Sequence, residues 1–206
     1  MGCGYGAFSE LVGKALGFRE IHGIDIDEDR GKVASQRGLV VSDCDLEKDP
    51  FPYPADSFDF IISFGAFDHL GSLDNVVSEA SRVLEPQGCL AISTTNLGSW
   101  VNRVALLLGY QPRNLEISKK GLFGVHSLYR DAYSCASPMG RVSVHTLRAL
   151  EEYLNFNGFE PVKRWGVGLV PAPDQGPTIL LRTLDRVFSK WPSWAVRYIL
   201  LSRKIN

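Results

Sequence analysis

Residues 2–6 read GCGYG, and residues 23–27 read GIDID. Alternating glycines permit positive φ angles and let a ligand approach the backbone closely. The residues that follow the glycines predict an amphipathic helix, because apolar side chains recur at helical spacing at Phe8, Leu11, Val12, Ala15 and Leu16. The free N–H groups at the start of a helix suit a carboxylate or phosphate. The opening stretch therefore predicts a ligand-binding turn.

Asp25 strengthens this prediction because it ends a short apolar strand expected within residues 20–27. A carboxylate at that place can accept both ribose hydroxyls of an adenosine. The spacing Gly2-x-Gly4-x-x-Ala7 also fits the dinucleotide fingerprint G-x-G-x-x-A. Loop and acid together predict a nucleoside ligand. They leave open whether it is S-adenosylmethionine (SAM) or NAD(P).

The rest of the chain alternates strands with helices. The pattern predicts further helices near residues 73–84, 96–110, 146–157 and 180–188. It predicts further strands near residues 39–43, 58–64, 89–94, 159–167 and 195–202. Such alternation is typical of βαβ units in an α/β fold whose mainly parallel sheet is covered on both faces. We expect a single domain over residues 1–206, with a lid or insertion at about 96–145.

Composition narrows the partners. A net charge of -1 over 206 residues gives no reason to expect nucleic acid or an anionic membrane as a partner. The four cysteines are far apart, without metal-type spacing, so we expect a reduced cytoplasmic protein without a metal site. The sequence contains no apolar run of about 18 residues. Arginine, lysine and aromatic residues mix over residues 182–204, which we interpret as an edge helix and a final strand with a solvated face.

Four motifs in order carry a resemblance to a known family. They are GCGYG (2–6), GIDID (23–27), SDCDLEKDPFPYPADSFDFIIS (42–63) and FDHLGSLDNVVSEASRVLEPQGCLAIST (67–94). The chain resembles class I SAM-dependent methyltransferases, specifically the type 11 group of small-substrate enzymes. The resemblance implies a Rossmann-like three-layer sandwich with strand order 3-2-1-4-5-7-6 and strand seven antiparallel. It also implies SAM as the cofactor and a small molecule as the methyl acceptor, with the oligomeric state left open.

The resemblance also assigns roles to residues. The loop residues that would pass beneath the amino-acid portion of SAM are Gly2, Cys3, Gly4, Tyr5 and Gly6. Asp25 would hold the ribose, and Ile26 would lie against the adenine. Asp45, followed by Leu46, would receive the adenine amino group, with Asp43 as the alternative. The residues expected to line the methionine side are Ser63 and Phe64.

The acceptor side rests on fewer residues. His69 follows a predicted strand at the edge of the sheet where ligands of open α/β folds bind, so it is the candidate general base. Its alternative interpretation is a structural histidine at a helix start. His126, Tyr129 and Tyr133 are candidates for the substrate pocket, with a packed aromatic surface as the alternative.

The sequence departs from the family pattern at two places. Gln87 stands where the family has the first glycine of a Pro-Gly-Gly turn, and we expect the turn to form nonetheless. The family's first strand, which precedes the glycine loop, has no counterpart before Gly2. We therefore expect unpaired strand edges in the core, low stability and SAM binding that is weak or absent, and we expect a chain extended upstream to bind. The alternatives are an NAD(P)-dependent oxidoreductase and an inactive methyltransferase-like protein.

Overall fold

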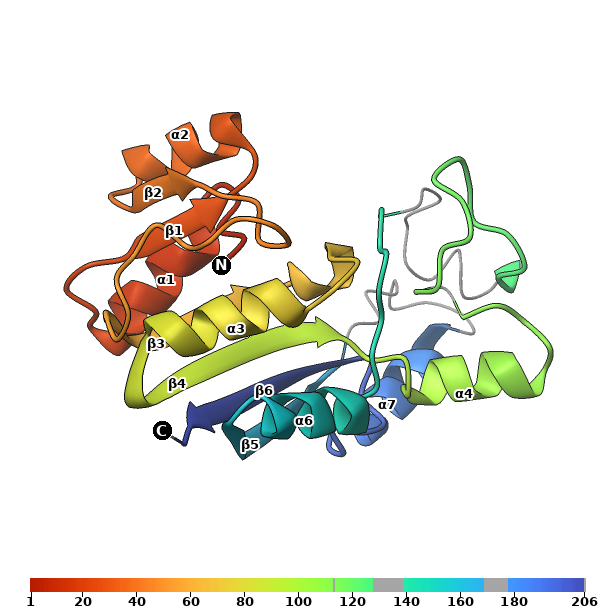
Figure 1. The fold of residues 1–206 in the computed structure, drawn as a ribbon. Helices are drawn as coiled ribbons and strands as arrows, with labels where there is room; N and C mark the ends of the chain where they lie inside the picture. The colour runs from red at the N-terminus through yellow and green to blue at the C-terminus, as the bar shows by residue number, and fades with distance from the viewer. Residues whose placement is uncertain (113, 128–138, 169–177, 206) are drawn as a thin grey trace.

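The computed structural model describes residues 1–112, 114–127, 139–168 and 178–205 (Figure 1). The strands are β1 (His22–Asp25), β2 (Val40–Asp43), β3 (Phe58–Phe64), β4 (Leu84–Thr95), β5 (Phe159–Val167) and β6 (Arg197–Lys204). The helices are α1 (Ala7–Leu16), α2 (Glu28–Gln36), α3 (Asp74–Val83), α4 (Trp100–Leu107), α6 (Leu147–Phe156) and α7 (Thr178–Phe188), with a 3-10 turn, η1, at Phe67–His69. All the helices and strands expected from the sequence are present.

The strands form two sheets. In the numbering of the predicted order, β1 and β2 are strands two and three, β3 and β4 are strands four and five, and β5 and β6 are strands six and seven. The observed order is the predicted one without strand one. One sheet pairs β1 with β2 in parallel, and the other runs β3-β4-β6-β5. Strand β6 is antiparallel to both of its neighbours, whereas β3 and β4 are parallel. The antiparallel last strand inserted between β4 and β5 confirms the Rossmann-like α/β class that the motifs predict.

The strands β1 and β3 face each other without pairing. Between them lies an open groove, lined largely by apolar side chains from both sheets. Residues of the glycine loop close one end of the groove. The amino group of Met1 donates to the Ile62 carbonyl at 2.7 Å, and the Cys3 N–H donates to the Ile24 carbonyl at 3.1 Å. The expected unpaired edges are therefore present within the described residues, and the loop is anchored to both sheets.

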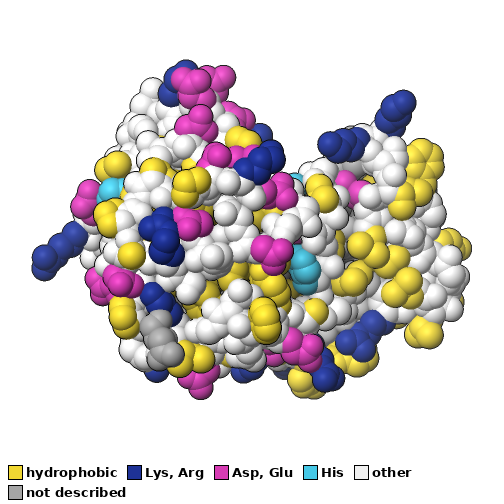
Figure 2. Space-filling model, viewed as in Figure 1, with side chains coloured by type: hydrophobic (Ala, Val, Ile, Leu, Met, Phe, Trp, Pro, Cys, Tyr) yellow, Lys and Arg dark blue, Asp and Glu magenta, His cyan; other side chains and the backbone are white. Residues whose placement is uncertain are grey.

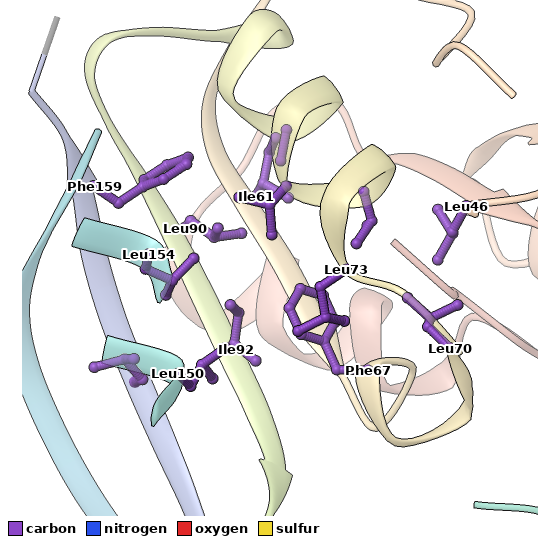
Figure 3. Packing of buried hydrophobic residues seen from close by; sticks show 14 of the residues in the cluster. Leu46, Ile61, Phe67, Leu70, Leu73, Leu90, Ile92, Leu150, Leu154 and Phe159 are labelled. Atoms are coloured by element: carbon purple, nitrogen blue, oxygen red, sulfur yellow. The ribbon is translucent and has the colours of Figure 1, made fainter. Parts of the chain in front are cut away.

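The main core lies between the four-stranded sheet and the helices α3 and α6 (Figure 3). Its side chains alternate along the strands, as expected for residues that point to one face of a sheet. The residues that fill this layer include Ile61, Val76, Leu90, Ile92, Leu150, Leu154, Phe159 and Leu200. This layer supports the ends of β3 and β4, where the predicted site residues lie.

The helix α1 differs from its expected packing. Its apolar stripe faces outward, since Phe8 is 47% exposed and Leu11 is 65% exposed. Gly13 is the buried position of the helix. A ring contact between Phe8 and Phe64, with centroids 4.7 Å apart, joins the helix to β3. The stripe remains exposed because no described element covers that side of the helix.

The turn expected before the strand at residues 89–94 lies inside β4, which begins at Leu84. Phe58 pairs with Leu84 and Phe60 pairs with Cys89, so residues 85–88 bulge from a strand that begins earlier than expected. Gln87 has φ of 68°, a left-handed conformation that favours glycine. The expected turn forms, and its conformation explains the preference for glycine at this position in the family.

The surface is mixed in character. Acidic side chains gather over α2, and this face is hollowed between the β1–β2 unit and the loops that follow α4 (Figure 2). Among the described residues, none of the helices has the length and hydropathy needed to cross a membrane.

Candidate cofactor and substrate site

The glycine loop has the backbone geometry that its sequence predicts. Gly2, Gly4 and Gly6 all have positive φ, at 63°, 51° and 75°. A Cβ on Gly2 would lie 2.6 Å from the Cβ of Ala66, and a Cβ on Gly6 would lie 2.8 Å from that of Ala34. A Cβ on Gly4 would meet no described atom within 4 Å. The outer two glycines therefore permit close packing, whereas Gly4 faces open space.

Asp25 is held against this loop. Its Oδ2 accepts a hydrogen bond of 2.7 Å from the Gly4 N–H, and its Oδ1 accepts one of 3.1 Å from the Asp27 N–H. The two bonds fix the carboxylate at the end of β1 beside the open space above Gly4. Each carboxylate oxygen has a further lone pair available for a hydroxyl donor. The arrangement fits the ribose of a nucleoside.

The residues expected near the adenine lie in different surroundings. Ile26 is 67% exposed and follows Asp25. The Asp45 carboxylate accepts bonds from the Glu47 N–H at 2.9 Å and Lys48 Nζ at 2.8 Å. The hydrogen bond from Lys48 lowers the pKa of Asp45. Thus Asp45 is engaged within its own turn, and the side chain of its neighbour Leu46 is buried in the core.

The alternative acid, Asp43, is exposed and directly opposite Asp25 in the parallel register of β1 and β2. Both carboxylates line a hollow beside α2, together with Lys32 and Ser35. The structure therefore leaves Asp43 as the more accessible of the two candidates for the adenine amino group.

The remaining loop and strand candidates differ in their exposure to solvent. Tyr5 is exposed, with the Arg30 guanidinium 5.7 Å from its ring centroid. Burial raises the pKa of the Cys3 thiol. The sulfur of this loop residue lies close to Gly23 of β1. Ser63 is buried, and its Oγ has no hydrogen-bond partner among the described residues. Phe64 packs on Phe8, as described above, at the carboxyl end of β3.

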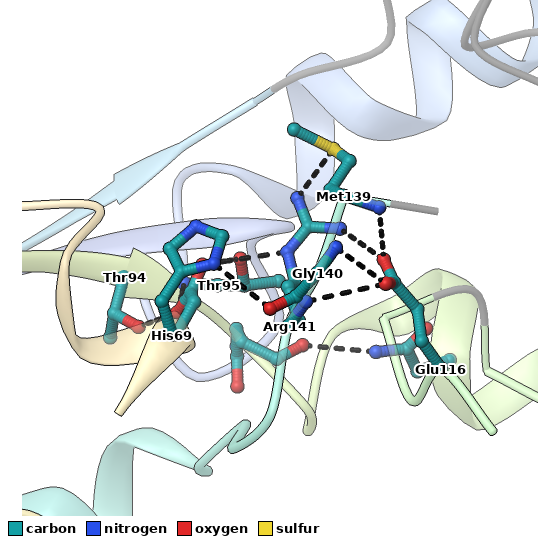
Figure 4. Close-up of polar contacts among 10 residues, drawn as sticks. His69, Thr94, Thr95, Glu116, Met139, Gly140 and Arg141 are labelled. Atoms are coloured by element: carbon teal, nitrogen blue, oxygen red, sulfur yellow. Dashed lines mark hydrogen bonds and ion pairs between the residues drawn. The ribbon is translucent and has the colours of Figure 1, made fainter. Parts of the chain in front are cut away.

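His69 ends the η1 turn that follows β3. It is exposed, and its Nδ1 lies 3.0 Å from the Gly140 carbonyl oxygen (Figure 4). A carbonyl oxygen can only accept, so this contact assigns the ring proton to Nδ1 and leaves Nε2 as the acceptor. A neutral imidazole with this tautomer can take a proton at Nε2.

A buried polar cluster lies beside His69. The carboxylate of Asp68, with a side chain 3% exposed, accepts hydrogen bonds from the hydroxyls of Thr94 and Thr95 and from the Thr95 N–H. Its Oδ2 also lies 3.5 Å from Arg141 Nε. These contacts join the η1 turn, the end of β4 and the segment before α6 at one edge of the sheet.

Glu116 completes the cluster on the other side of Arg141 (Figure 4). Its carboxylate lies 3.5 Å from Arg141 Nη1 and accepts bonds from three successive N–H groups, those of Met139, Gly140 and Arg141. Both side chains of this ion pair are at most 8% exposed. The carboxylate therefore fixes the backbone that presents the Gly140 carbonyl to His69.

The predicted substrate-pocket residues are only partly described. The ring of His126 meets that of Tyr110 edge to face, with centroids 4.8 Å apart. Tyr129 and Tyr133 lie outside the described residues. The buried cluster was not predicted, because its members come from segments far apart in the sequence. The pair Thr94-Thr95 at the end of an apolar strand is the local signal that could have drawn attention to it.

Together, the two sheets, the glycine turn and the acid at the end of β1 define a Rossmann-like α/β domain with a candidate nucleotide site. The strand order with an antiparallel β6 is that of the class I methyltransferases.

Comparisons with known proteins give the same class. Residues 1–92 match the Methyltransf_11 family model, described as "Methyltransferase domain". The match agrees with the resemblance of the motifs in this segment to the class I, type 11 SAM-dependent methyltransferases. The match favours the methyltransferase interpretation over the oxidoreductase alternative.

Particular relatives extend the comparison. Malonyl-[acyl-carrier protein] O-methyltransferase from Methylococcus capsulatus is 37% identical over 101 residues, a region that spans 46% of this chain and 35% of that protein. A SAM-dependent methyltransferase from Thermotoga maritima superposes with TM-score 0.62 at 16% identity, covering 100% of this chain and 80% of the other. Geranyl diphosphate C-methyltransferase from Streptomyces coelicolor was solved with Mg²⁺, geranyl diphosphate and S-adenosyl-L-homocysteine. It superposes with TM-score 0.56 at 16% identity, covering 98% of this chain and 68% of the other. These solved structures share the fold across almost the whole chain.

Proposed function

We propose that this chain is the catalytic domain of a SAM-dependent methyltransferase that acts on a small-molecule acceptor. The observation that carries the proposal is the bond between the Gly4 N–H and the Asp25 carboxylate, which joins the glycine loop to a ribose-binding acid. The match of residues 1–92 to a methyltransferase family supports the same activity. SAM supplies an electrophilic methyl group on a sulfonium centre.

The residues of the loop fit such a cofactor because Gly4 faces open space and leaves its surroundings uncrowded. The loop of Gly2–Gly6 would hold the amino-acid portion, Asp25 the ribose hydroxyls, and Ile26 one face of the adenine. Asp43 or Asp45 would receive the adenine amino group. These groups contribute by positioning, since alignment of the reacting atoms accounts for roughly 7–11 kcal/mol of barrier reduction in favourable cases.

On the acceptor side, we propose His69 as the general base. Its Nε2 would accept a proton from the acceptor while Nδ1 remains bonded to the Gly140 carbonyl. Residues 96–145 would form the lid, because the segment at residues 139–143 already lies against η1 through bonds from the Val142 and Ser143 N–H groups to the Asp68 carbonyl. A small molecule is the expected acceptor, like the geranyl diphosphate named for one structural neighbour, whereas the name of the curated relative specifies a malonyl group on acyl-carrier protein.

We also propose a cytoplasmic location without nucleic acid as a substrate. The net charge of -1 supports the second part, and the free thiols of Cys3, Cys44 and Cys89 suit a reducing compartment.

Calorimetric titration with S-adenosylhomocysteine (SAH) and, separately, with NADH tests the proposal. Binding of SAH without binding of NADH would support the proposal. Binding of NADH alone would favour the oxidoreductase, whereas binding of SAH without methyl transfer to any acid, amine or phenol in an acceptor panel would favour the inactive methyltransferase-like protein.

A further inference from the structure

Arg197 lies at the start of β6, next to the buried cluster, and the activity proposed above does not use it. Its Cα pairs with that of Thr95 across the sheet. A Cβ placed on Gly65 would lie 3.7 Å from Arg197 Nη2, so the guanidinium reaches across the end of β4 to the residue that follows β3. The side chain is therefore directed along the edge of the sheet and not into bulk solvent.

This edge is close to the glycine loop. Gly65 precedes Ala66, and Gly2 packs so closely on Ala66 that a Cβ would lie 2.6 Å from it. The contacts from Gly2 through Ala66 and Gly65 to Arg197 connect the loop to the guanidinium. Arg197 is thus near the methionine end of the proposed cofactor site, where an acceptor must lie.

The guanidinium lacks a partner of its own. It makes no hydrogen bond or ion pair within the part of the chain that the structure describes. Burial lowers the pKa of Arg197, and the charge of Arg141 lowers it further, although the Asp68 carboxylate raises it. A partly buried cation without a direct partner is costly, which favours an anion at this place.

Asp68 cannot serve as that partner. Its two carboxylate oxygens offer about four acceptor positions. Thr94 Oγ1 and the Thr95 N–H occupy those of Oδ1, and Thr95 Oγ1 and Arg141 Nε occupy those of Oδ2. Among the described residues, the donors of Arg197 therefore have no acceptor.

We propose that Arg197 binds an oxyanion of the methyl acceptor, so that the acceptor is a carboxylate or phosphate compound. A guanidinium presents two parallel N–H donors that match the oxygens of either group. This inference rests on the proposed function for its setting, but the anion site can be tested separately. The anion orients the acceptor through Arg197, which makes Arg197 a specificity-determining residue.

The test is calorimetric titration of the SAH-loaded protein with succinate, inorganic phosphate and the uncharged dimethyl succinate. We expect succinate, phosphate or both to bind, and dimethyl succinate not to bind. Preference for succinate identifies a carboxylate acceptor, and preference for phosphate identifies a phosphorylated one. Arg197→Gln is expected to weaken anion binding by about tenfold or more, equivalent to about 1.4 kcal/mol. The matched control Arg203→Gln, on the exposed part of the same strand, should leave it unchanged.

The results separate the two proposals. The proposed anion site is overturned if Arg197→Gln binds anions as tightly as the wild type. It is also overturned if the wild type binds neither succinate nor phosphate. If Arg197→Gln does not fold, Arg197→Lys replaces it, because lysine keeps the charge but loses the bidentate fork. Unchanged anion affinity in that variant also overturns the proposal. If the protein does not bind SAH, the same titrations are made without SAH, and anion binding that depends on Arg197 would then overturn only the proposed function.

Discussion

The Gly4 N–H donates a 2.7 Å hydrogen bond to Oδ2 of Asp25, so the ligand-binding turn and the acid at the end of β1 form one unit. Asp25→Asn should weaken SAH binding by about tenfold to a hundredfold, because hydrogen bonds to a charged group contribute about 1.5–3 kcal/mol. Titration calorimetry measures the change. Asp29→Asn on α2 is the control, since its side chain is 93% exposed. Equal SAH affinity in both variants would remove Asp25 from the site.

A second prediction separates two effects of alanine at Gly4: the backbone cost of a positive φ and the entry of a Cβ into the proposed cofactor site. Gly4 and Gly17 both have positive φ, and a Cβ on either would meet no described atom within 4 Å. Alanine at each should therefore reduce the free energy of unfolding by a similar amount, about 1–2 kcal/mol. Only Gly4→Ala should reduce SAH affinity, because only its Cβ enters the proposed cofactor site.

Urea denaturation and SAH titration of the two variants provide the comparison. A loss of SAH affinity in Gly17→Ala that matches the loss in Gly4→Ala would mean that stability, and not access to the loop, controls binding.

The sequence predicted the turn and Asp25 because both are local features. Three glycines at alternate positions permit positive φ before a helix, and a strand-end acid is typical of nucleotide-binding βαβ units. The strand order was available only through the family resemblance. The packing of α1 was not predictable from its periodicity, because the spacing of Phe8 and Leu11 shows that a stripe exists and not whether another element covers it.

The acceptor side was less predictable for a different reason. His69 could be placed at the end of a strand from the sequence alone, but Asp68 reads locally as an ordinary acid at a helix start. Its role depends on Thr95, Arg141 and Glu116, which tertiary structure brings together from distant segments. Arg197 was grouped with a solvated face, yet its side chain is partly buried and its guanidinium lies beside Gly65.

Removal of the charge of Asp68 should destabilise the fold strongly. Asp68→Asn leaves Arg141 without one of its two carboxylates in a buried setting, and it replaces an acceptor oxygen with a donor that faces a threonine hydroxyl or N–H. Breaking a buried ion pair costs about 3–5 kcal/mol. The matched change Glu152→Gln breaks an exposed ion pair with Arg148 and should cost at most about 0.5 kcal/mol.

Urea denaturation of these two variants at pH 7 measures the difference. Similar free energies of unfolding for both would show that Asp68 is not the centre of the cluster.

The last prediction concerns acid stability and the pair Glu79–Arg82. The hydrogen bonds from Arg82 lower the pKa of Glu79, whose side chain is only 13% exposed and also accepts a bond from the Phe51 N–H. A carboxyl group with a lowered pKa in the folded state stabilises the fold above its unfolded pKa of about 4.3, and this stabilisation is lost as the pH falls through the folded value. Glu79→Gln should therefore reduce the free energy of unfolding by about 1.5 kcal/mol at pH 7. This value is at the low end of the range for hydrogen bonds to charged groups, because solvent screens Arg82. At the lowest pH the substitution should have no effect.

Urea denaturation of wild type and Glu79→Gln at a series of pH values from neutral to acid tests this expectation. The two curves of unfolding free energy against pH should begin to approach each other near the unfolded pKa of about 4.3 and converge once the pH is below the lowered pKa of the folded state. Glu28→Gln on the exposed surface of α2 is the control and should follow the wild type closely at neutral pH. A constant difference between wild type and Glu79→Gln over the whole series would show that the variant acts through packing of the loop at Phe51 and not through the charge of Glu79.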